Sequence, residues 1–579
     1  MNTKRELKPT KRILLTGVFG PFGVDDEYGR KENIMELFHN QVTKAQGAGS
    51  VRIFHRSFGL YFLAANVDAD VTVLDFPSKK RFEREIKKGY DIVGISFIAP
   101  NFVKAREMAR LTRMFAPDAT IILGGHGAAI EGVRDLIDCD HVVRGEGIKW
   151  LRRFLGQEPD APILHPILPT GENQSVFGVP IPGATASLLV PGVGCVNGCK
   201  FCSTSHFFGK SYTPFLGTGR EVFETACQIA DSRGTDHFFV MDENFLKDQD
   251  RAMDLIDEMV RHKRFFSFYL FSSAETISAF GIENLVRLGV MFLWIGVESK
   301  HDENNYAKNQ GIDAKTLIME LRNHGITVLA SGILCAEHHT PQNISEDIDY
   351  LVGLEPDMLQ FMLLTPLPTT ALYKDHKARG WLRIDLPYEE WHGQKMLSYH
   401  HPAFKEGEPE RWMDAAFRQD FEMNSSSMYR QIETALRGYR TLSAIPERDE
   451  CLELRLATAK NRAKEYSLML PIIERFAVNE LERERAQKLG REITATFGKK
   501  TLKEKLTRAA AYALAIRWNI RMRFFGDGIQ PPTFVTRFKP VKEGNKRSTV
   551  PIANCRRVHK VESAIPSAAA IVGDEATAG

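Results

Sequence analysis

Residues 194–202 read Gly194-Cys195-Val196-Asn197-Gly198-Cys199-Lys200-Phe201-Cys202, which places three cysteines on one short stretch. Thiolates this close together can all bind one metal centre. Three ligands, rather than four, leave one iron of a cubane cluster open to a small molecule. The run Ala186-Ser187-Leu188-Leu189-Val190 predicts a strand just before this loop. A structural zinc site that includes His206 is the alternative, although zinc sites more often pair two C-x-x-C motifs and the sequence has no second pair.

The spacing C-x-x-x-C-x-x-C, with an aromatic residue before the last cysteine, resembles the cluster loop of radical S-adenosylmethionine (SAM) enzymes. The resemblance implies that Cys195, Cys199 and Cys202 bind a 4Fe-4S cluster and take part in catalysis. It also implies that the open iron chelates SAM, and that an electron from the cluster cleaves SAM to a 5'-deoxyadenosyl radical. Phe201 would present backbone groups to the adenine of SAM.

The composition is that of an ordinary globular protein with about three or four domains. The chain has 579 residues, 43% hydrophobic and 26% charged, with a net charge of +3. So small a charge gives no general attraction to nucleic acid, and no such partner is expected. The polar residues 1–8 lack a signal-peptide core, and no apolar run is long enough for a bilayer, so the sequence predicts a cytoplasmic protein. The other cysteines are scattered, as expected in a reducing compartment: Cys139, Cys227, Cys335, Cys451 and Cys555.

Strands and helices alternate along residues 11–155, which predicts an α/β domain over residues 1–155. Short apolar runs joined by helical patterns, such as 101–115, indicate a parallel, doubly wound, Rossmann-like sheet. Open sheets of this kind bind ligands at the carboxyl ends of their strands. The expected strands cover residues 12–16, 71–75, 91–96, 120–125 and 141–147.

This domain resembles the cobalamin-binding domain fused to many radical SAM enzymes. The resemblance is carried by Asp75, Gly94-Ile95-Ser96, Gly124-Gly125-His126-Gly127 and Gly145-Glu146-Gly147. It implies that the corrin ring and its nucleotide tail are lined by Ser96, Gly124, Gly125, His126, Gly145 and Glu146. The D-x-H-x-x-G signature that gives cobalt a histidine in related proteins is absent, so the lower face of cobalamin would lack that ligand. A flavodoxin-like domain without a ligand is the alternative.

Residues 156–185 are rich in Pro and Gly and read as a linker. A second alternation of strands and helices follows over 186–400, and it resembles the partial (β/α)6 barrel of radical SAM proteins. Strand-first repeats indicate a parallel barrel whose site lies at the carboxyl ends of the strands. The expected strands are Leu188–Val190, Phe238–Met241, Phe268–Ser272, Phe292–Val297, Val328–Leu334 and Met358–Leu364.

Carboxylates follow the second barrel strand, at Asp242 and Glu243. In radical SAM enzymes this position binds the amino group of SAM, and an ammonium needs such acceptors. The sequence leaves open which of the two points inward. The alternative role of the segment 242–244 is to cap the following turn of helix.

Two later strand ends also match the family. Ile295-Gly296-Val297-Glu298-Ser299 resembles its G-x-E-S motif, so Glu298 and Ser299 would bind the ribose or methionyl part of SAM. Ser331 falls where the fifth strand passes the adenine. The sequence after that strand departs from the family pattern, and His338 and His339 are expected in a solvated loop.

The remaining sequence, residues 401–540, predicts a helical C-terminal domain, followed by a disordered tail over 541–579. Between Lys499 and Phe524, eight basic residues interleave with apolar and aromatic ones. Such a helix can lie on an anionic membrane surface, or pack on the barrel with a solvated basic face.

The two resemblances together imply a cobalamin-dependent radical SAM enzyme that functionalises an unactivated carbon. Methylation is the leading reaction, with cobalamin as the methyl carrier. One alternative is ring formation, oxidation or carbon–carbon coupling without methyl transfer, including on a lipid. Another is a sensor that binds cobalamin or the cluster, although a sensor needs no SAM pocket. The implied partners are a small-molecule or lipid substrate, an electron donor such as flavodoxin or ferredoxin, and a peripheral contact at the inner membrane face.

Overall fold

The computed structural model describes residues 11–30, 52–169, 171–176, 179–180, 186–300, 309, 311–525 and 530–540. All of them belong to one compact unit, residues 1–540. The tail predicted to be disordered, residues 541–579, lies outside the described residues.

A six-stranded sheet forms the first part of the fold, in the order β17-β3-β1-β4-β5-β6. Its five N-terminal strands run parallel: β1 Arg12–Thr16, β3 Asp70–Asp75, β4 Ile92–Ser96, β5 Thr120–Gly124 and β6 His141–Val142. Alternate residues of β1 are buried on opposite faces. Leu14 packs with α3 (Lys79–Ile86) and α4 (Phe102–Phe115), whereas Leu15 packs with α2 (Phe58–Ala65). Helices therefore cover both faces, which confirms the predicted doubly wound sheet.

The edge of this sheet comes from the other end of the chain. Strand β17 (Phe534–Phe538) pairs antiparallel with β3. The guanidinium of Arg56 lies 3.3 Å from the ring centroid of Phe534, and Lys539 pairs with Asp70 at 2.8 Å. A strand was not expected in the region predicted as helical, because its partner is more than 450 residues away and no local pattern reveals it.

The segment predicted as a linker also contains regular structure. Strands β7 (Gly171–Val176) and β8 (Val179–Pro180) form a small antiparallel sheet with β2 (Arg52–His55). The segment read as a linker, residues 156–185, thus contains two short strands. The domain limits themselves remain a prediction.

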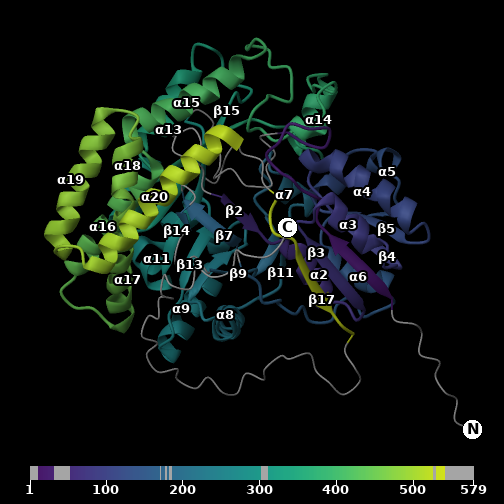
Figure 1. Cartoon of the computed structure of the whole chain (residues 1–579), viewed down its shortest axis with the longest axis horizontal. Coiled ribbons are helices and arrows are strands. Elements are labelled where there is room, and N and C mark those ends of the chain that lie inside the picture. The colour runs from purple at the N-terminus through teal and green to yellow at the C-terminus, as the bar shows by residue number, and fades with distance from the viewer. Residues whose placement is uncertain are drawn as a thin grey trace, which may run out of the picture. The chain divides into compact units, whose positions relative to one another are not determined.

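A second six-stranded sheet has the order β16-β15-β14-β13-β12-β9, and all its neighbours are parallel. Figure 1 shows its strands in teal near the middle of the view. The strands are β9 Ser187–Leu189, β12 His237–Val240, β13 Ser267–Phe271, β14 Val290–Glu298, β15 Thr327–Leu334 and β16 Met358–Leu363. Each begins and ends within two residues of its predicted bounds. The strictly sequential order confirms the predicted partial (β/α)6 barrel.

The helices of the repeats cover one face of this sheet: α8 Gly219–Arg233, α9 Gln249–His262, α10 Ala274–Phe280, α11 Ile282–Leu288, α12 Ala314–Asn323, α13 Ile344–Gly353 and α14 Ala371–Ala378. Phe238 on β12 shares a core with Phe223 of α8 and Leu255 of α9. Its neighbour Phe239 must therefore point to the opposite, inner face of the barrel.

The two sheets meet through buried apolar side chains. Leu188 from β9 belongs to the same core as Leu15, and Phe239 packs against that core. Val190, just after β9, forms a smaller cluster with Phe62 of α2. These contacts bring the start of the barrel against the first sheet.

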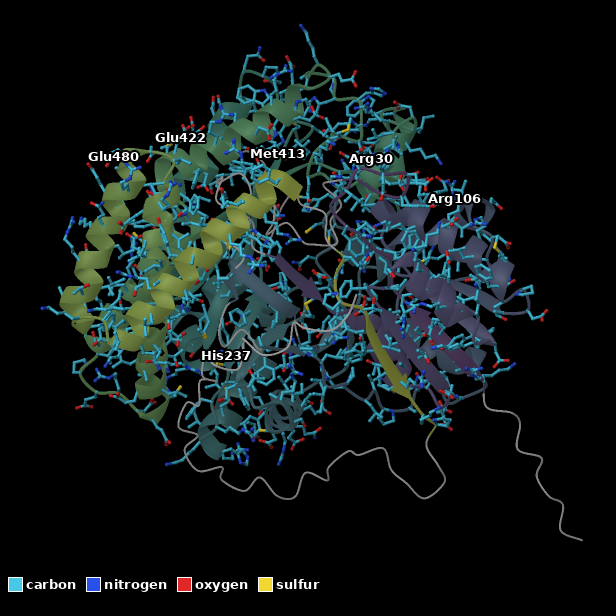
Figure 2. The ribbon with its side chains drawn as sticks, viewed as in Figure 1. Arg30, Arg106, His237, Met413, Glu422 and Glu480 are labelled. Carbon is cyan, nitrogen blue, oxygen red and sulfur yellow. The ribbon has the colours of Figure 1, made fainter. Side chains whose placement is uncertain are left out.

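Polar contacts join the first domain to the segment after the barrel strands. Arg30, which Figure 2 labels, donates from Nε to Glu390 Oε1 at 2.9 Å. The backbone N–H of Val103 donates to Glu389 at 3.0 Å. Both carboxylates belong to the 3-10 helix Tyr388–Glu390.

The C-terminal region is helical as predicted, apart from β17. It contains α15 Glu408–Asn424, α16 Ser427–Ser443, α17 Glu450–Tyr466, α18 Leu470–Phe476, α19 Glu480–Phe497 and α20 Leu502–Phe525. None of the helices in the described part of the chain combines the length and apolarity needed to cross a bilayer.

Candidate active site

Two glycines shape the cysteine loop. Gly194 has a φ of +94°, and a Cβ there would lie 2.2 Å from the carbonyl oxygen of Ser211. Gly198 has a φ of +65°. Only glycine adopts such angles without strain, so the loop can turn sharply after β10 (Gly192–Gly194) and lead into α7 (Ser203–Phe207).

The side chain of Ser205 ties the loop together. Its hydroxyl donates to the carbonyl of Cys195 at 2.8 Å and accepts from the N–H of Gly198 at 3.1 Å. His206 Nε2 lies 3.2 Å from the carbonyl oxygen of Cys199, which only accepts, so this nitrogen carries a proton. Both side chains act as supports for the loop backbone. The three thiols therefore remain the predicted ligand set, and as thiolates they are the donors that iron–sulfur clusters take.

Burial raises the pKa of the Cys195 thiol and raises the pKa of Cys202 to about 12. The negative charge of Glu243 adds to both shifts. The thiols therefore hold their protons at neutral pH, and a metal cluster that binds them must displace those protons. Raised values of this kind fit a ligand set that becomes thiolate only with its metal.

Asp242 is engaged by the protein itself. It accepts from Tyr212 Oη at 2.7 Å, from Arg251 Nη2 at 3.0 Å and from the N–H of Asn244 at 3.1 Å. The side chains of Asp242 and Arg251 are each 2% exposed. Ion pairs this deeply buried need saturating hydrogen bonds, which Tyr212 and Asn244 supply here.

Glu243 is the strand-end carboxylate beside the thiols. It accepts a hydrogen bond from the Thr204 side chain. Its side chain is exposed, but desolvation by the surrounding protein, and then the charge of Asp242, raise the pKa of its carboxyl. The structure thus separates the two acids that the sequence could not. Asp242 is paired with Arg251, and Glu243 is the acid whose charge raises the pKa of both Cys195 and Cys202, whereas Asp242 acts on Cys195 only.

The capping role considered for this segment is wrong for Asn244. Its side chain makes no cap bond to the turn Phe245–Lys247. It donates instead to Ser273 Oγ at 2.8 Å and accepts from Ser272 Oγ at 2.7 Å. Asn244 therefore joins the carboxyl ends of β12 and β13.

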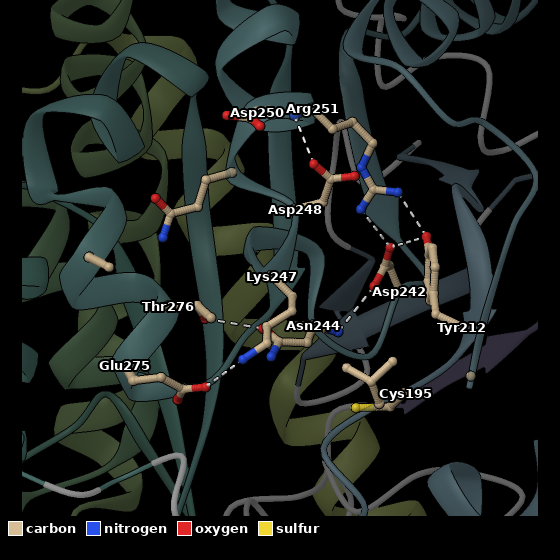
Figure 3. Close-up of a pocket in the computed structure, with 14 residues that line it drawn as sticks. Cys195, Tyr212, Asp242, Asn244, Lys247, Asp248, Asp250, Arg251, Glu275 and Thr276 are labelled. Carbon is tan, nitrogen blue, oxygen red and sulfur yellow. Dashed lines mark hydrogen bonds and ion pairs between the residues drawn. The ribbon is translucent and has the colours of Figure 1, made fainter. Parts of the chain in front are cut away.

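A cavity of about 650 Å³ borders the cysteine loop at Cys195. Figure 3 shows the group of Asp242, Tyr212 and Arg251 at one wall, with Lys247 and Glu275 paired on another. The amine of Lys247 lies 3.6 Å from the Glu275 carboxylate. The walls thus offer charges of both signs, which suits a zwitterionic group such as the methionyl end of SAM.

Glu298 ends β14 in a conformation that is unusual for a residue with a side chain. Its φ is +70°, the pairing with β15 shifts register beside it, and it is 5% exposed. Strained residues of this kind persist where the surrounding structure holds them, and they cluster at functional sites.

The adjacent Ser299 belongs to a buried polar network. Asp347 accepts from Ser299 Oγ, from the N–H of Lys300 at 2.9 Å and from His339 Nε2 at 2.7 Å. Burial alone would raise the pKa of Asp347, but hydrogen bonds from His338, His339 and Ser299 hold it far below its usual range. The network fixes the chain directly after Glu298.

The expectation that both histidines lie in a solvated loop was wrong for His339. Its side chain is completely buried, and its Nδ1 accepts from the N–H of Ala336 at 2.9 Å. The proton is therefore on Nε2, which donates to Asp347. His338 keeps 29% of its side chain exposed.

Half-buried aromatic rings line the inner face of the barrel below these strand ends. The ring centroids of Phe239 and Phe271 are 5.6 Å apart, and those of Phe271 and Trp294 are 4.9 Å apart in a stacked arrangement. Ser331 lies one step nearer the strand ends, paired with Gly296. An apolar group held on this face would lie directly below the predicted SAM site.

The predicted cobalamin residues gather at the carboxyl ends of β4, β5 and β6. Gly125 has a φ of +77°, and a Cβ there would lie 2.6 Å from the carbonyl oxygen of Phe97. A Cβ on Gly124 would meet nothing within 4 Å, so the space beside it is free for a ligand. Ser96 ends β4 and is half-buried.

His126 and Glu146 have different surroundings at this edge. Nδ1 of His126 is buried and has no hydrogen-bond partner among the described residues. Burial lowers the pKa of His126 to about 4, so the ring is neutral at pH 7. An unsatisfied buried nitrogen beside an open glycine fits a site completed by a polar ligand. Glu146 instead caps α6 (Gly147–Phe154), where it accepts from the N–H groups of Ile148 and Lys149.

The carboxyl ends of β4, β5 and β6 lie close to the cysteine loop of the barrel. The ring of His126 lies 4.5 Å from that of Phe207, the last residue of α7. A Cβ on Gly145 would lie 3.7 Å from the carbonyl oxygen of Phe207. The glycine-ended strands of the first sheet therefore lie against the helix that follows Cys202.

Sequence reasoning missed the residues that hold the acids in place: Arg251, Tyr212, Thr204 and Asp347. Each lies at least nine residues from its acid or, for Asp347, from Ser299. None of them lies in a local sequence motif, so only the three-dimensional structure shows that they contact these side chains.

Comparisons with known proteins agree with this arrangement. Residues 48–155 match the family model of the B12 binding domain. The chain is 23% identical over 368 residues to an uncharacterised methyltransferase of Pyrococcus horikoshii, which covers 55% of this chain and 77% of that one. It is 22% identical over 369 residues to bacteriochlorophyllide d C-8(2)-methyltransferase of Chlorobaculum tepidum, covering 58% and 78%.

Among solved structures, the chain is similar to TsrM, a radical S-adenosylmethionine methyltransferase of Kitasatospora setae with cobalamin and a 4Fe-4S cluster bound. The TM-score is 0.48 at 14% identity, over 78% of this chain and 99% of that one. The B12-binding match agrees with the parallel strands β3, β4, β5 and β6 of the first sheet. The chain therefore contains a B12-binding domain, and over more than half of its length it is similar to methyltransferases.

Proposed function

We propose that this enzyme transfers a methyl group to an unactivated carbon of a small molecule. The observation that carries the proposal is the contact of His126 with Phe207, because it brings the predicted corrin edge against the predicted cluster loop. A reaction that uses both cofactors on one substrate needs them on adjacent walls. The names of the two relatives, both methyltransferases, favour methyl transfer over the other outcomes.

In this proposal, Cys195, Cys199 and Cys202 hold the cluster, and Glu243 accepts from the ammonium of SAM. When bound, the cluster supplies the electron that cleaves SAM, and cobalamin carries the methyl group. Glu243 suits its role because it lies beside the thiols and is not taken up by an arginine. Asp242 acts through Arg251 as a positioning residue.

Three further residues would complete the SAM site. Glu298 and Ser299 bind the ribose or methionyl part, and Ser331 lies beside the adenine together with Phe201. Asp347 keeps Ser299 in place through its short hydrogen bond. A site held so firmly can fix the reacting bond relative to the substrate, which is the protein's main contribution in such enzymes.

On the cobalamin side, the backbone of Gly124 and Gly125 would approach the corrin closely, with Ser96 and Gly145 beside it. Neutral His126 offers its free Nδ1 to a polar group of the ligand. Glu146 keeps its carboxylate on the helix N-terminus and shapes the edge rather than meeting the ligand directly.

We also propose that the substrate has a flat or apolar surface, because Phe239, Phe271 and Trp294 line the inner face of the barrel. The electron would come from a donor such as flavodoxin or ferredoxin. A peripheral membrane contact is part of the same proposal, with α20 as the element that makes it.

The decisive experiment uses the full chain, reconstituted anaerobically with iron and sulfide and given SAM, hydroxocobalamin and a strong reductant. Products are followed by mass spectrometry. We expect 5'-deoxyadenosine, and S-adenosylhomocysteine only when cobalamin is present. The matched variants are Cys199→Ala, which should abolish both products, and Cys139→Ala, a buried cysteine of the first sheet domain, which should retain both.

The outcomes separate the alternatives. 5'-Deoxyadenosine without cobalamin-dependent S-adenosylhomocysteine would contradict methyl transfer and favour ring formation, oxidation or coupling. Absence of both products, together with absence of cluster absorbance and of SAM binding, would contradict an enzyme of this class and favour a sensor.

A further inference from the structure

Helix α20 (Leu502–Phe525) is the longest helix of the described chain, and it packs by a narrow face. Ala511 and Ala515 are buried against Ile472 of α18. Figure 1 shows the helix in yellow, lying across the other C-terminal helices at the front of the view. Its opposite face therefore points away from the protein.

That outer face is apolar. Leu502, Leu506, Ile520 and Phe524 are exposed by 74%, 63%, 52% and 73%. Steps of four and seven residues link them, with exposed Ala513 between Leu506 and Ile520, so all five fall on one line along the helix. Four large exposed side chains on a single line are not the scattered apolar residues of an ordinary surface. We call this line the outer stripe.

Basic side chains flank the outer stripe. Lys503 and Arg521 lie on one side, Lys505 and Arg523 on the other, and all four are exposed. Glu504, the single acidic residue of the helix, points to the packed face, where it pairs with Lys464 at 3.3 Å. The face turned outward therefore carries positive charge only, around an apolar line.

We propose that α20 binds the surface of an anionic lipid bilayer, with the outer stripe inserted among the acyl chains and the flanking bases on the lipid phosphates. An apolar stripe between rows of Lys and Arg is the pattern of helices that lie in a membrane interface. A protein partner would need acidic groups on both sides of an apolar ridge, whereas an anionic bilayer presents both features everywhere. This inference rests on the membrane contact included in the proposed function and names its surface, but it does not depend on the methyl transfer.

The test is co-sedimentation of the full chain with vesicles. One set contains equal parts of phosphatidylglycerol and phosphatidylcholine, and the other only phosphatidylcholine. We expect the bound fraction to be about tenfold higher on the anionic vesicles, and to fall when the salt is raised, because salt screens the basic rows. The double variant Leu506→Glu/Phe524→Glu should lower binding to anionic vesicles about tenfold or more.

Matched controls separate the stripe from general effects. Ile384→Glu changes a large apolar residue outside α20 that is 89% exposed, the highest value among the described residues of this kind, and this variant should bind as the unmodified protein does. Circular dichroism should show the same helix content in every variant. Lys503→Glu/Arg521→Glu should weaken binding to anionic vesicles and leave the weak binding to neutral ones unchanged.

Two results would overturn the proposal. One is equal sedimentation with anionic vesicles and without vesicles. The other is a dimer in analytical ultracentrifugation that Leu506→Glu/Phe524→Glu converts to a monomer, since the outer stripe would then belong to a contact between two copies of the chain.

Discussion

The barrel and the first sheet present opposite kinds of edge to the space between them. At the barrel edge, Asp242 and Asp347 are buried charges held by dense hydrogen bonds. At the edge of the first sheet, Gly124 and Gly125 present bare backbone to a ligand. The neutral His126 adds a ring nitrogen that has no hydrogen-bond partner among the described residues. A charged ligand such as SAM needs fixed charges, whereas a broad, flat ligand needs close access to backbone. The contrast suggests that each edge is built for a different cofactor.

The largest expected effect is the complete loss of the cluster at the barrel edge. Replacing Cys195, Cys199 and Cys202 by alanine should abolish the iron–sulfur absorbance of the reconstituted protein, because all protein ligands are lost. The cluster absorbance can be followed directly by ultraviolet–visible spectroscopy. Cobalamin binding, measured after gel filtration, should survive. Retention of the cluster absorbance in the triple variant would refute the ligand assignment.

Arg251→Met tests whether the barrel edge depends on its buried charges. The change leaves Asp242 buried without its cation, which should cost about 3–5 kcal/mol of unfolding free energy. Urea unfolding measures it. Arg220→Met, on an exposed surface pair, should stay within about 0.5 kcal/mol. Equal small shifts for both variants would mean that the Asp242 pair does not hold the edge.

Glu243→Gln removes a charge at the barrel edge without changing its shape. The amide oxygen of Gln can still accept from the ammonium but lacks the negative charge, so SAM should bind about tenfold more weakly. Isothermal titration with SAM measures this, while the cluster absorbance should be unchanged. Asp257→Asn, an exposed carboxylate on α9, serves as the control. Unchanged SAM affinity in Glu243→Gln would assign the ammonium to another acceptor.

Gly125→Ala tests the close backbone approach in the first sheet. Its φ of +77° and the contact of a Cβ with Phe97 predict a cost of about 1–3 kcal/mol and weaker cobalamin binding. Gly156→Ala has a similar φ of +69° but meets nothing within 4 Å, so it isolates the backbone strain. If both variants bind cobalamin equally well, the cradle at Gly125 does not shape the corrin site.

The smallest expected effect concerns pH. The folded pKa of His126, about 4, lies below the unfolded value of about 6.5, so the neutral ring favours the folded state. This contribution is complete above about pH 6.5 and is lost as the pH falls towards 4. His126→Phe keeps the ring contact with Phe207 and should flatten the fall in stability across this window by about 1–2 kcal/mol. Parallel pH curves for both proteins, from urea unfolding, would mean that His126 is not the buried neutral group described here.

The sequence predicted the elements that follow a local repeating pattern of strands and helices. The barrel strands were found within two residues because each is a short apolar run between helical patterns, and Gly125 and Glu298 stood at predicted strand ends. It could not predict β17, or the pairing of Asp242 with Arg251, because these depend on residues brought together by the fold. His339 was placed in a solvated loop for the same reason, since its partner Asp347 lies on the next helix.

Strand β17 also has a consequence for how the protein is made. Until Phe534–Phe538 leaves the ribosome, β3 has a bare edge, and Thr533 is 457 residues beyond its contact at Phe76. At about 5–20 residues per second, that edge waits on the order of 20–90 s for its last strand. An open strand edge invites pairing with another chain, so the nascent protein passes through a long interval in which it is most prone to aggregate. Slow translation late in the message would lengthen that exposure.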